Sequence, residues 1–310
     1  MTIAAGLALA ASSCIYEYDK CPPALTLKIE NDWQAAPEAD PEGMAYMFFS
    51  DLGGEPWRFD FAGREGGEVS LIPGDYSFVS FNDDTYNVRF REDGGYEGYE
   101  AYTVRADDSY LPAAVRELDE KLHVCPDMMW GCSYDYVGLK YSGLEYGEPA
   151  VRSESYILRC PQRHLTARYS FLIENVTNLD GVVSLSAVFT GLACSLNLAD
   201  GAKGDYPCML PSAAKKGGET SIEGEFLTFG IPAEPTADNY LLLFVVLSDG
   251  RKFTYHFDVT PQVRNAPDPL DVKVIIRGLE LEESEGGSKP GGGFDVSVDG
   301  WISITINIQG

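Results

Sequence analysis

Seven cysteines are the residues of this chain best suited to covalent or metal-binding chemistry. Cys125 and Cys132 close a short loop and are the first candidates for a disulfide, with Cys194 and Cys208 next. The cysteines after the first allow many pairings, which the sequence alone does not rank. The alternative is a thiolate metal site near His123, but such sites use ligands in pairs about two to four residues apart. The spacing here does not fit, so we predict disulfides and no bound metal.

The first cysteine, Cys14, lies behind a short apolar leader. Residues 3–11 are apolar, and residues 11–13 are small. The leader is too short to cross a bilayer, which takes roughly 20 apolar residues, but it suits an export signal. Small residues directly before a thiol resemble a bacterial lipobox, so we predict a lipoprotein signal peptide over residues 1–13, a lipidated Cys14 and a tether over residues 14–23. The alternatives are an ordinary cleaved secretory peptide with Cys14 in a disulfide, or a buried N-terminal segment.

No set of residues indicates catalysis. The histidines His123, His164 and His256 stand far apart, and His256 alternates with aromatic residues as strand residues do. The chain contains no Gly-x-Ser-x-Gly elbow, His-Glu-x-x-His pair or phosphate-binding loop. Acidic pairs such as Asp83-Asp84 could serve glycoside hydrolysis or calcium binding, but neighbouring side chains point in different directions along a strand. We interpret these acids as solvated surface and predict that the protein is not an enzyme and needs no cofactor.

Aromatic residues are the remaining candidates for ligand binding. The stretch 82–110 is rich in tyrosine and in acidic residues. Aromatic rings on a surface could stack on sugars or form an adhesive patch. The candidate ligand-facing residues are Trp57, Tyr96, Tyr99 and Trp130. The alternative, which we favour, is that the aromatic residues of this stretch alternate inward along strands and belong to the core.

The charge of the chain excludes one class of partner. Its 23 basic and 48 acidic residues give a formal net charge of −25. Nucleic acid is not an expected partner, because its binding depends on clustered basic side chains that displace counterions. An anionic membrane surface would not attract the chain by charge either, so membrane attachment would depend on the lipid at Cys14.

Nearly every segment after Cys21 predicts β-structure. Residues 25–30 alternate apolar and polar side chains, as expected for a strand with one buried face. Similar short runs recur at intervals of about 8–12 residues with turn-forming residues between them, which favours a sandwich or barrel rather than a βαβ sheet. Residues 111–123 are an exception, because their Leu and Val residues recur at helical spacing and predict a short flanking helix. We therefore predict an all-β chain with one short helix.

The chain divides where its composition changes. Residues 141–155 are poor in apolar residues and rich in turn formers, so we place a boundary there. The predicted units are an N-terminal β-sandwich over residues 24–150 and a C-terminal β-sandwich over residues 151–310. Within the second unit, residues 240–247 are continuously apolar and predict a central strand covered on both faces.

The end of the chain is distinct in composition. Residues 282–293 form an acidic, Gly-rich spacer. Beyond it, residues 294–309 alternate apolar and polar side chains in two runs separated by Asp299 and Gly300. This pattern predicts two terminal strands able to form a hairpin.

Three segments together resemble a known family. They are Cys14–Pro22, the strand entry Gly191–Cys194, and the closing sequence GGGFDVSVDGWISITINIQ. They are similar to the fimbrillin superfamily of Bacteroides-type bacteria, and more closely to the lipoproteins grouped with minor and anchor subunits of type V pili. The resemblance implies two tandem transthyretin-like Greek-key sandwiches. It also implies lipidation at the outer membrane, with Glu17 and Asp19 favouring export to the cell surface.

The same resemblance implies a structural function. We expect a cell-surface lipoprotein that anchors, assembles or caps fimbriae, or that mediates adhesion, with fimbrial subunits or other surface proteins as partners through strand addition. No basic cleavage site precedes the first strand, because Lys20 lies too near Cys21 and Lys28 lies inside the strand. This argues against a polymerising shaft subunit. The alternative function is a glycan-binding lipoprotein of a nutrient-uptake system, which would use the Tyr-rich stretch 82–110.

Overall fold

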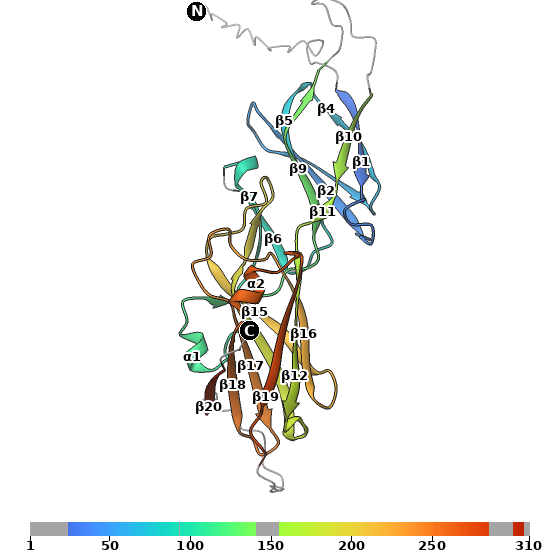
Figure 1. Ribbon diagram of the computed structural model, residues 1–310. Helices are drawn as coiled ribbons and strands as arrows, with labels where there is room; N and C mark the ends of the chain where they lie inside the picture. The colour runs from blue at the N-terminus through green and yellow to red at the C-terminus, as the bar shows by residue number, and fades with distance from the viewer. Residues whose placement is uncertain (1–23, 93, 141–154, 285–299, 307–310) are drawn as a thin grey trace, which may run out of the picture.

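The computed structural model describes residues 24–92, 94–140, 155–284 and 300–306, and almost all of its regular structure is β. Figure 1 shows two β-sandwiches arranged end to end, with short strands at the junction between them. The prediction of an all-β chain with two sandwiches is confirmed. No helix within the described ranges is long and apolar enough to cross a membrane.

Two sheets form the N-terminal sandwich, and their hydrophobic side chains pack between them. Alternation places Leu25, Leu27 and Ile29 on the buried face of the first strand, as the sequence predicts. One sheet has the order β10-β1-β4 and the other β11-β9-β5-β2-β3. Their bounds are β1 Leu25–Asp32, β2 Gly43–Ser50, β3 Trp57–Ala62, β4 Gly66–Leu71, β5 Gly74–Asn82, β9 Trp130–Leu139, β10 Ser155–Pro161 and β11 Arg163–His164.

A small third sheet covers the second face of β2 and β5 at the junction. It has the order β14-β7-β6, with bounds β6 Val88–Glu92, β7 Tyr99–Thr103 and β14 Ser195–Asn197, and the 3-10 turn η2 spans Tyr96–Gly98. Phe49 and Phe81 of the larger sheet pack here with Tyr99, and Leu196 joins them from the second half of the chain. The two sandwiches are therefore joined by a shared hydrophobic cluster as well as by the chain.

The C-terminal sandwich is made from one continuous set of pairings that folds over at β15. The first half of β15 pairs with β13 and its second half with β16, so this strand belongs to both layers. One layer has the order β19-β12-β16 and the other β13-β17-β18-β20, and β8 pairs with the outer side of β15. The bounds are β8 Lys121–Leu122, β12 Ala167–Thr177, η3 Leu179–Gly181, β13 Val182–Ala193, β15 Pro207–Lys216, β16 Ser221–Thr228, β17 Tyr240–Leu247, β18 Lys252–Asp258, α2 Thr260–Arg264, β19 Asp271–Glu280 and β20 Trp301–Ile306.

The central strand β17 is buried on both faces, as its unbroken apolar sequence predicts. One face packs in the sandwich core, and the other lies under the segment 111–122. Each fully buried Leu, Val or Phe contributes about 1.5–3 kcal/mol, so this strand is a major source of stability. The hairpin between β17 and β18 turns at Gly250, which has a φ of 88°.

The predicted helix over residues 111–123 is much shorter in the structure. Only Ala113–Arg116 form helix α1, because residues 121–122 instead pair as β8 with β15. Of the four apolar residues at helical spacing, Leu111, Val115 and Leu122 cover the outer face of β17, whereas Leu118 is 42% exposed. The segment lies on the C-terminal sandwich, although it precedes the predicted boundary.

Sheet pairing also bears on the predicted division of the chain. The composition change over residues 141–154 lies outside the described residues. Strand β10, which follows it, pairs in parallel with β1, so the N-terminal sandwich includes strands from beyond residue 150. We therefore propose a division after β11, with the segment 111–122 contributed to the C-terminal sandwich by the first half of the chain.

Candidate functional site

The edge strand β20 ends the sheet order of the C-terminal sandwich. It pairs in parallel with β18, from Lys252 opposite Trp301 to Phe257 opposite Ile306. Ile304 and Ile306 pack on the sandwich core, whereas Trp301 meets Phe244 on the outer face, with ring centroids 5.5 Å apart. Within the described residues no strand pairs with the other side of β20. Its outer main-chain groups are therefore free to bind another strand.

A groove of about 520 Å³ lies beside β20. Its apolar part is made by Tyr255, Ile304 and Ile306, and burial raises the pKa of the Tyr255 hydroxyl. Its rim carries the exposed carboxylates of Glu280, Glu282 and Glu283. The groove can accept alternate apolar side chains of an extended segment, and its rim favours basic residues at the flanks of that segment.

The strand at the other end of the sheet order, β19, is capped at one residue. Helix α2 places Gln262 beside this strand, where its Oε1 accepts from the Ile275 N–H at 2.8 Å and its Nε2 donates to the Ile275 carbonyl oxygen at 2.9 Å. A side-chain amide thus satisfies main-chain groups that a neighbouring strand would otherwise bind. Covering one edge leaves β20 as the more accessible edge of this sandwich.

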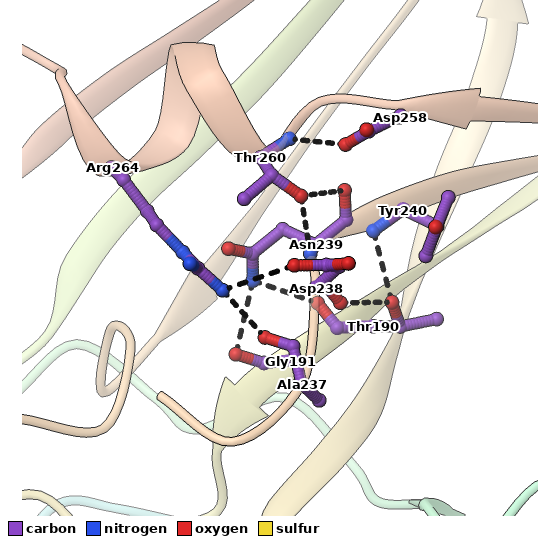
Figure 2. A network of polar contacts seen from close by, with 9 residues as sticks. All are labelled: Thr190, Gly191, Ala237, Asp238, Asn239, Tyr240, Asp258, Thr260 and Arg264. Carbon is purple, nitrogen blue, oxygen red and sulfur yellow. Dashed lines mark hydrogen bonds and ion pairs between the residues drawn. The ribbon is translucent and has the colours of Figure 1, made fainter. Parts of the chain in front are cut away.

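A buried polar network fixes α2 in this position (Figure 2). Asn239 is fully buried, and its Nδ2 donates to the carbonyl oxygens of Thr190 and Gly191 at 3.1 and 3.0 Å. Its main-chain N–H donates to Oγ1 of Thr260, the first residue of α2, at 2.9 Å. At the other end of α2, Arg264 donates to the loop before β17 at 2.8 Å. Asn239 thereby connects the start of the helix to β13, and Arg264 connects its end to the loop before β17.

A second groove, of about 420 Å³, lies at the junction sheet. The Arg91–Glu100 ion pair lies on one wall, with the Arg91 guanidinium 4.9 Å from the centre of the Tyr102 ring. Burial and the nearby Arg163 lower the pKa of Lys203 to about 8. The highly exposed ring of Tyr206 completes the lining.

The predicted disulfide residues are paired differently in space. Cys125 Sγ donates to the Pro211 carbonyl oxygen at 3.0 Å and packs at the C-terminal sandwich, whereas Cys132 lies in the N-terminal core beside Cys160. The structure therefore does not bring Cys125 and Cys132 together, because their loop opens across the junction. Cys194 and Cys208 do lie in contact. All five described cysteines are thiols in this structure.

The predicted ligand-facing aromatic residues do not form one surface. Tyr99 is only 6% exposed and packs between Phe49 and Phe81, which removes it as a ligand contact. Tyr96 donates from its hydroxyl to Asp135 at 2.8 Å, and Trp130 packs against Trp33 and His164. Trp57 is 44% exposed on the edge strand β3. Tyr102 and Tyr206, which line the junction groove, come from the predicted Tyr-rich stretch and from a loop that the sequence did not single out.

Two of the histidines considered in the sequence each contact one polar group of the surrounding fold. His123 contacts the Thr103 carbonyl oxygen at 2.9 Å and its pKa is lowered by burial, while His164 meets Glu38 at 2.8 Å. No group of three or more His, Cys, Asp or Glu side chains in the described ranges could hold a metal ion. Cys14, Glu17 and Asp19 lie outside the described residues.

Sequence reasoning missed the residues that shape the edges. A glutamine in a five-residue helix shows no periodic signal, and its role depends on β19, which follows later in the chain. The only available sign is Thr260-Pro261, because Pro in the first turn is typical of a helix start directly after a strand. Asn239 likewise belongs to a loop in sequence and to a fully buried site in space.

Comparison with known proteins assigns the chain to a family. Residues 13–211 match the family described as a domain of unknown function, DUF5119, and the chain belongs to that family. A candidate fimbrium anchoring subunit of Bacteroides ovatus, Fim4B, is 26% identical over 171 residues, which are 55% of this chain and 46% of that protein. The matched region thus spans about half the length of this relative.

Two solved structures share the fold. A candidate adhesin from Bacteroides ovatus superposes with a TM-score of 0.67 at 21% identity, over 91% of this chain and 100% of that chain. The fimbrial anchor protein Mfa2 from Porphyromonas gingivalis superposes with a TM-score of 0.51 at 15% identity, over 83% of this chain and 91% of that chain. The architecture of this chain is therefore that of known fimbrial and adhesin-type proteins.

Proposed function

We propose that this chain is a cell-surface lipoprotein that anchors, assembles or caps fimbriae by strand addition. The observation that carries the proposal is the outer edge of β20, which pairs with no strand of the described residues and lies beside a groove that joins Ile304 and Ile306 to an acidic rim. At the other edge strand of the sandwich, Gln262 caps Ile275. An extended segment of a fimbrial subunit would pair with β20 and insert alternate side chains next to Ile304 and Ile306. The likeness to a fimbrium anchoring subunit supports the same role, which is structural rather than catalytic.

One experiment tests the strand-addition step. The full chain is purified from solubilised outer membranes, and the fimbrial shaft subunit that accompanies it is quantified. Ile304→Asp places a charge on the groove side of β20, so we expect at least a tenfold loss of the shaft subunit. Thr305→Asp is the matched control, because its exposed side chain alternates to the other face of the same strand. Equal recovery with both variants would contradict binding at this edge.

The membrane attachment is a separate part of the proposal. Lipidation at Cys14 would hold the chain at the outer membrane, with Glu17 and Asp19 directing it to the cell surface. Cys14→Ala should release the chain from membranes and abolish labelling by a palmitate analogue, whereas Cys21→Ala should do neither. Replacing Glu17 and Asp19 by Ala should leave the chain membrane-bound but protect it from protease added to intact cells.

A glycan-binding role is the second candidate, favoured by the junction groove. Tyr102 and Tyr206 offer ring faces there, and polar groups such as Asn197 and Glu100 could hydrogen-bond to hydroxyl groups. A glycan array with the full chain tests this role. Binding that is lost in Tyr206→Ala and kept in Tyr86→Ala, an equally exposed tyrosine outside the groove, would support it.

A further inference from the structure

Four of the five described cysteines occur as two contacting pairs. The Cys132 and Cys160 side chains are within hydrogen-bonding contact, and so are those of Cys194 and Cys208. Each pair joins residues that lie on different strands or strand ends. Such placement is the geometric condition for a disulfide, because two thiols can be linked only where their side chains already meet.

The first pair links the two layers of the N-terminal sandwich. Cys132 lies on β9 of the five-stranded sheet, and Cys160 lies on β10 of the three-stranded sheet. Both are in the core, with exposed fractions of 6% and 0%. The Ser80 hydroxyl lies 3.3 Å from Cys132 Sγ. Contact with the Cys160 thiol and with this hydroxyl lowers the pKa of Cys132 in the folded chain.

The second pair lies where β13 ends at the junction of the two sandwiches. Cys208 on β15 is opposite Leu192 on β13, and Cys194 follows two residues later, diagonally across the same ladder. The Cys194 carbonyl oxygen also accepts from the Thr103 N–H at 3.0 Å, which ties this point to the N-terminal half of the chain. Cys194 lines the junction groove, whereas Cys208 is buried.

We propose that the exported protein carries two disulfides, Cys132–Cys160 and Cys194–Cys208, and that Cys125 remains a thiol. The proposal rests on the export step of the proposed function, which brings the chain to an oxidising compartment. For each link, one cysteine thiolate attacks a disulfide-containing oxidant and forms a mixed disulfide. The second thiolate then displaces the oxidant sulfur. The pair loses two protons and two electrons, and the oxidant leaves as a dithiol.

The two links differ in when they can form. Cys132 and Cys160 are sealed in a core once β10 docks, so an oxidant must reach them before the N-terminal sandwich closes. Cys194 stays accessible through the junction groove in the folded chain. Among the described cysteines, Cys125 forms no such thiol pair; its Sγ donates to the Pro211 carbonyl oxygen.

The test is a disulfide map of the full chain. Purified, reduced chain is refolded in a buffer of oxidised and reduced glutathione, alkylated under denaturing conditions and digested with trypsin. Residues 122–140 should be linked to residues 160–163, and residues 169–203 to residues 204–215. A further digestion before Asp127 separates Cys125 from Cys132, and Cys125 should carry the alkyl group. A link between Cys125 and Cys132, or full alkylation of Cys132 and Cys160, would overturn the proposal.

Variants and a cellular arm separate this proposal from the export step. Cys125→Ser should give the same two links, whereas Cys132→Ser should leave Cys160 alkylated and the Cys194–Cys208 link intact. The map is repeated on chain from the outer-membrane fraction of cells alkylated before lysis, where both links are again expected. Thiols at these positions in that fraction would overturn the proposal. Recovery of the chain only from the cytoplasm would contradict export instead, and the refolding arm would still decide the pairing.

Discussion

The side-chain amide of Gln262 forms two hydrogen bonds with the main chain of Ile275, at 2.8 and 2.9 Å. Within an antiparallel ladder, two residues that face each other exchange the same pair of bonds. One glutamine therefore takes the place of a residue in a neighbouring strand and ends the sheet at β19. Within the described residues, the C-terminal sandwich is thus capped at Ile275 on one edge strand and has no strand paired with the outer side of the other, β20.

Removing the side-chain amide of Gln262 should expose the main-chain groups of Ile275 at the β19 edge. Gln262→Ala leaves both Ile275 groups to water, so we expect a loss of about 1 kcal/mol in the free energy of unfolding and edge-to-edge association at micromolar concentration. Gln262→Glu is the control, because its carboxylate still accepts from the N–H and its charge discourages strand pairing. Sedimentation velocity and urea unfolding measure the two effects. A monomeric Gln262→Ala chain of unchanged stability would refute the assignment.

Asn239 should be the most sensitive residue of the polar network in Figure 2. Asn239→Ala removes two buried hydrogen bonds and leaves the carbonyl oxygens of Thr190 and Gly191 without that donor. We expect a loss of about 2–4 kcal/mol, measured by urea unfolding. Asn265→Ala, which loses one exposed bond to Pro261, should cost far less. Equal losses in the two variants would show that the network is not a stabilising centre.

Because of Glu120, the free energy of unfolding should decrease as the pH rises. Its Oε2 accepts from the Gly191 N–H at 2.6 Å, and burial raises the pKa of its carboxyl above the ordinary 4.5. The folded chain therefore binds this proton more tightly than the unfolded chain does. The contribution of Glu120 to the free energy of unfolding is therefore fully present below pH 4.5 and is lost as the pH rises through the pKa of this carboxyl in the folded chain.

The test variant is Glu120→Gln, which keeps an acceptor for Gly191 and has no charge. It should be more stable than the wild type at pH 7.5, and the difference should shrink toward pH 4.5. Urea midpoints at several pH values measure it. Glu117→Gln, an exposed neighbour on the same segment, should show no such trend. A constant difference between Glu120→Gln and wild type across the range would rule out titration of Glu120 as the cause.

The sequence predicts features that depend on local pattern and fails where distant strands meet. Residues 240–247 have no polar break, and β17 is buried on both faces as expected. Trp301 onward alternates as a strand should, but its parallel pairing with β18 depends on long-range register. The residues predicted as terminal strand before Asp299 lie outside the described ranges. Tyr99 was a candidate ligand-facing residue in a stretch that we favoured as core, and β7 places it in the junction core, where a second layer covers β2 and β5.

Which cysteines meet also depends on contacts between strands that are distant in the sequence. Closeness in sequence favoured Cys125 with Cys132, but β9 runs away from the loop and carries Cys132 into the other sandwich. The sequence did not single out Cys160 as a partner, and the parallel pairing of β10 with β1 places it in the core beside Cys132. Cys194 and Cys208 were the next candidate pair, and they lie in contact because the antiparallel pairing of β13 with β15 brings them together.

The two proposed disulfides should differ in their resistance to reduction in the folded chain. Cys194 lines an open groove, whereas Cys132 and Cys160 are 6% and 0% exposed. A small dithiol can therefore attack only the Cys194–Cys208 link without unfolding of the chain. Brief treatment with dithiothreitol, followed by isotope-coded alkylation, should label Cys194 and Cys208 first.

Loss of the Cys194–Cys208 link opens a loop of about 15 residues and should lower the free energy of unfolding by about 3 kcal/mol. The urea midpoint after mild reduction measures this loss, and a Cys194→Ser/Cys208→Ser chain should show the same midpoint before and after treatment. Cys132 and Cys160 should be labelled only after denaturant is added, because their sulfur atoms become accessible when β10 leaves the sandwich. Simultaneous labelling of all four residues in the folded chain would contradict the buried position of the first pair.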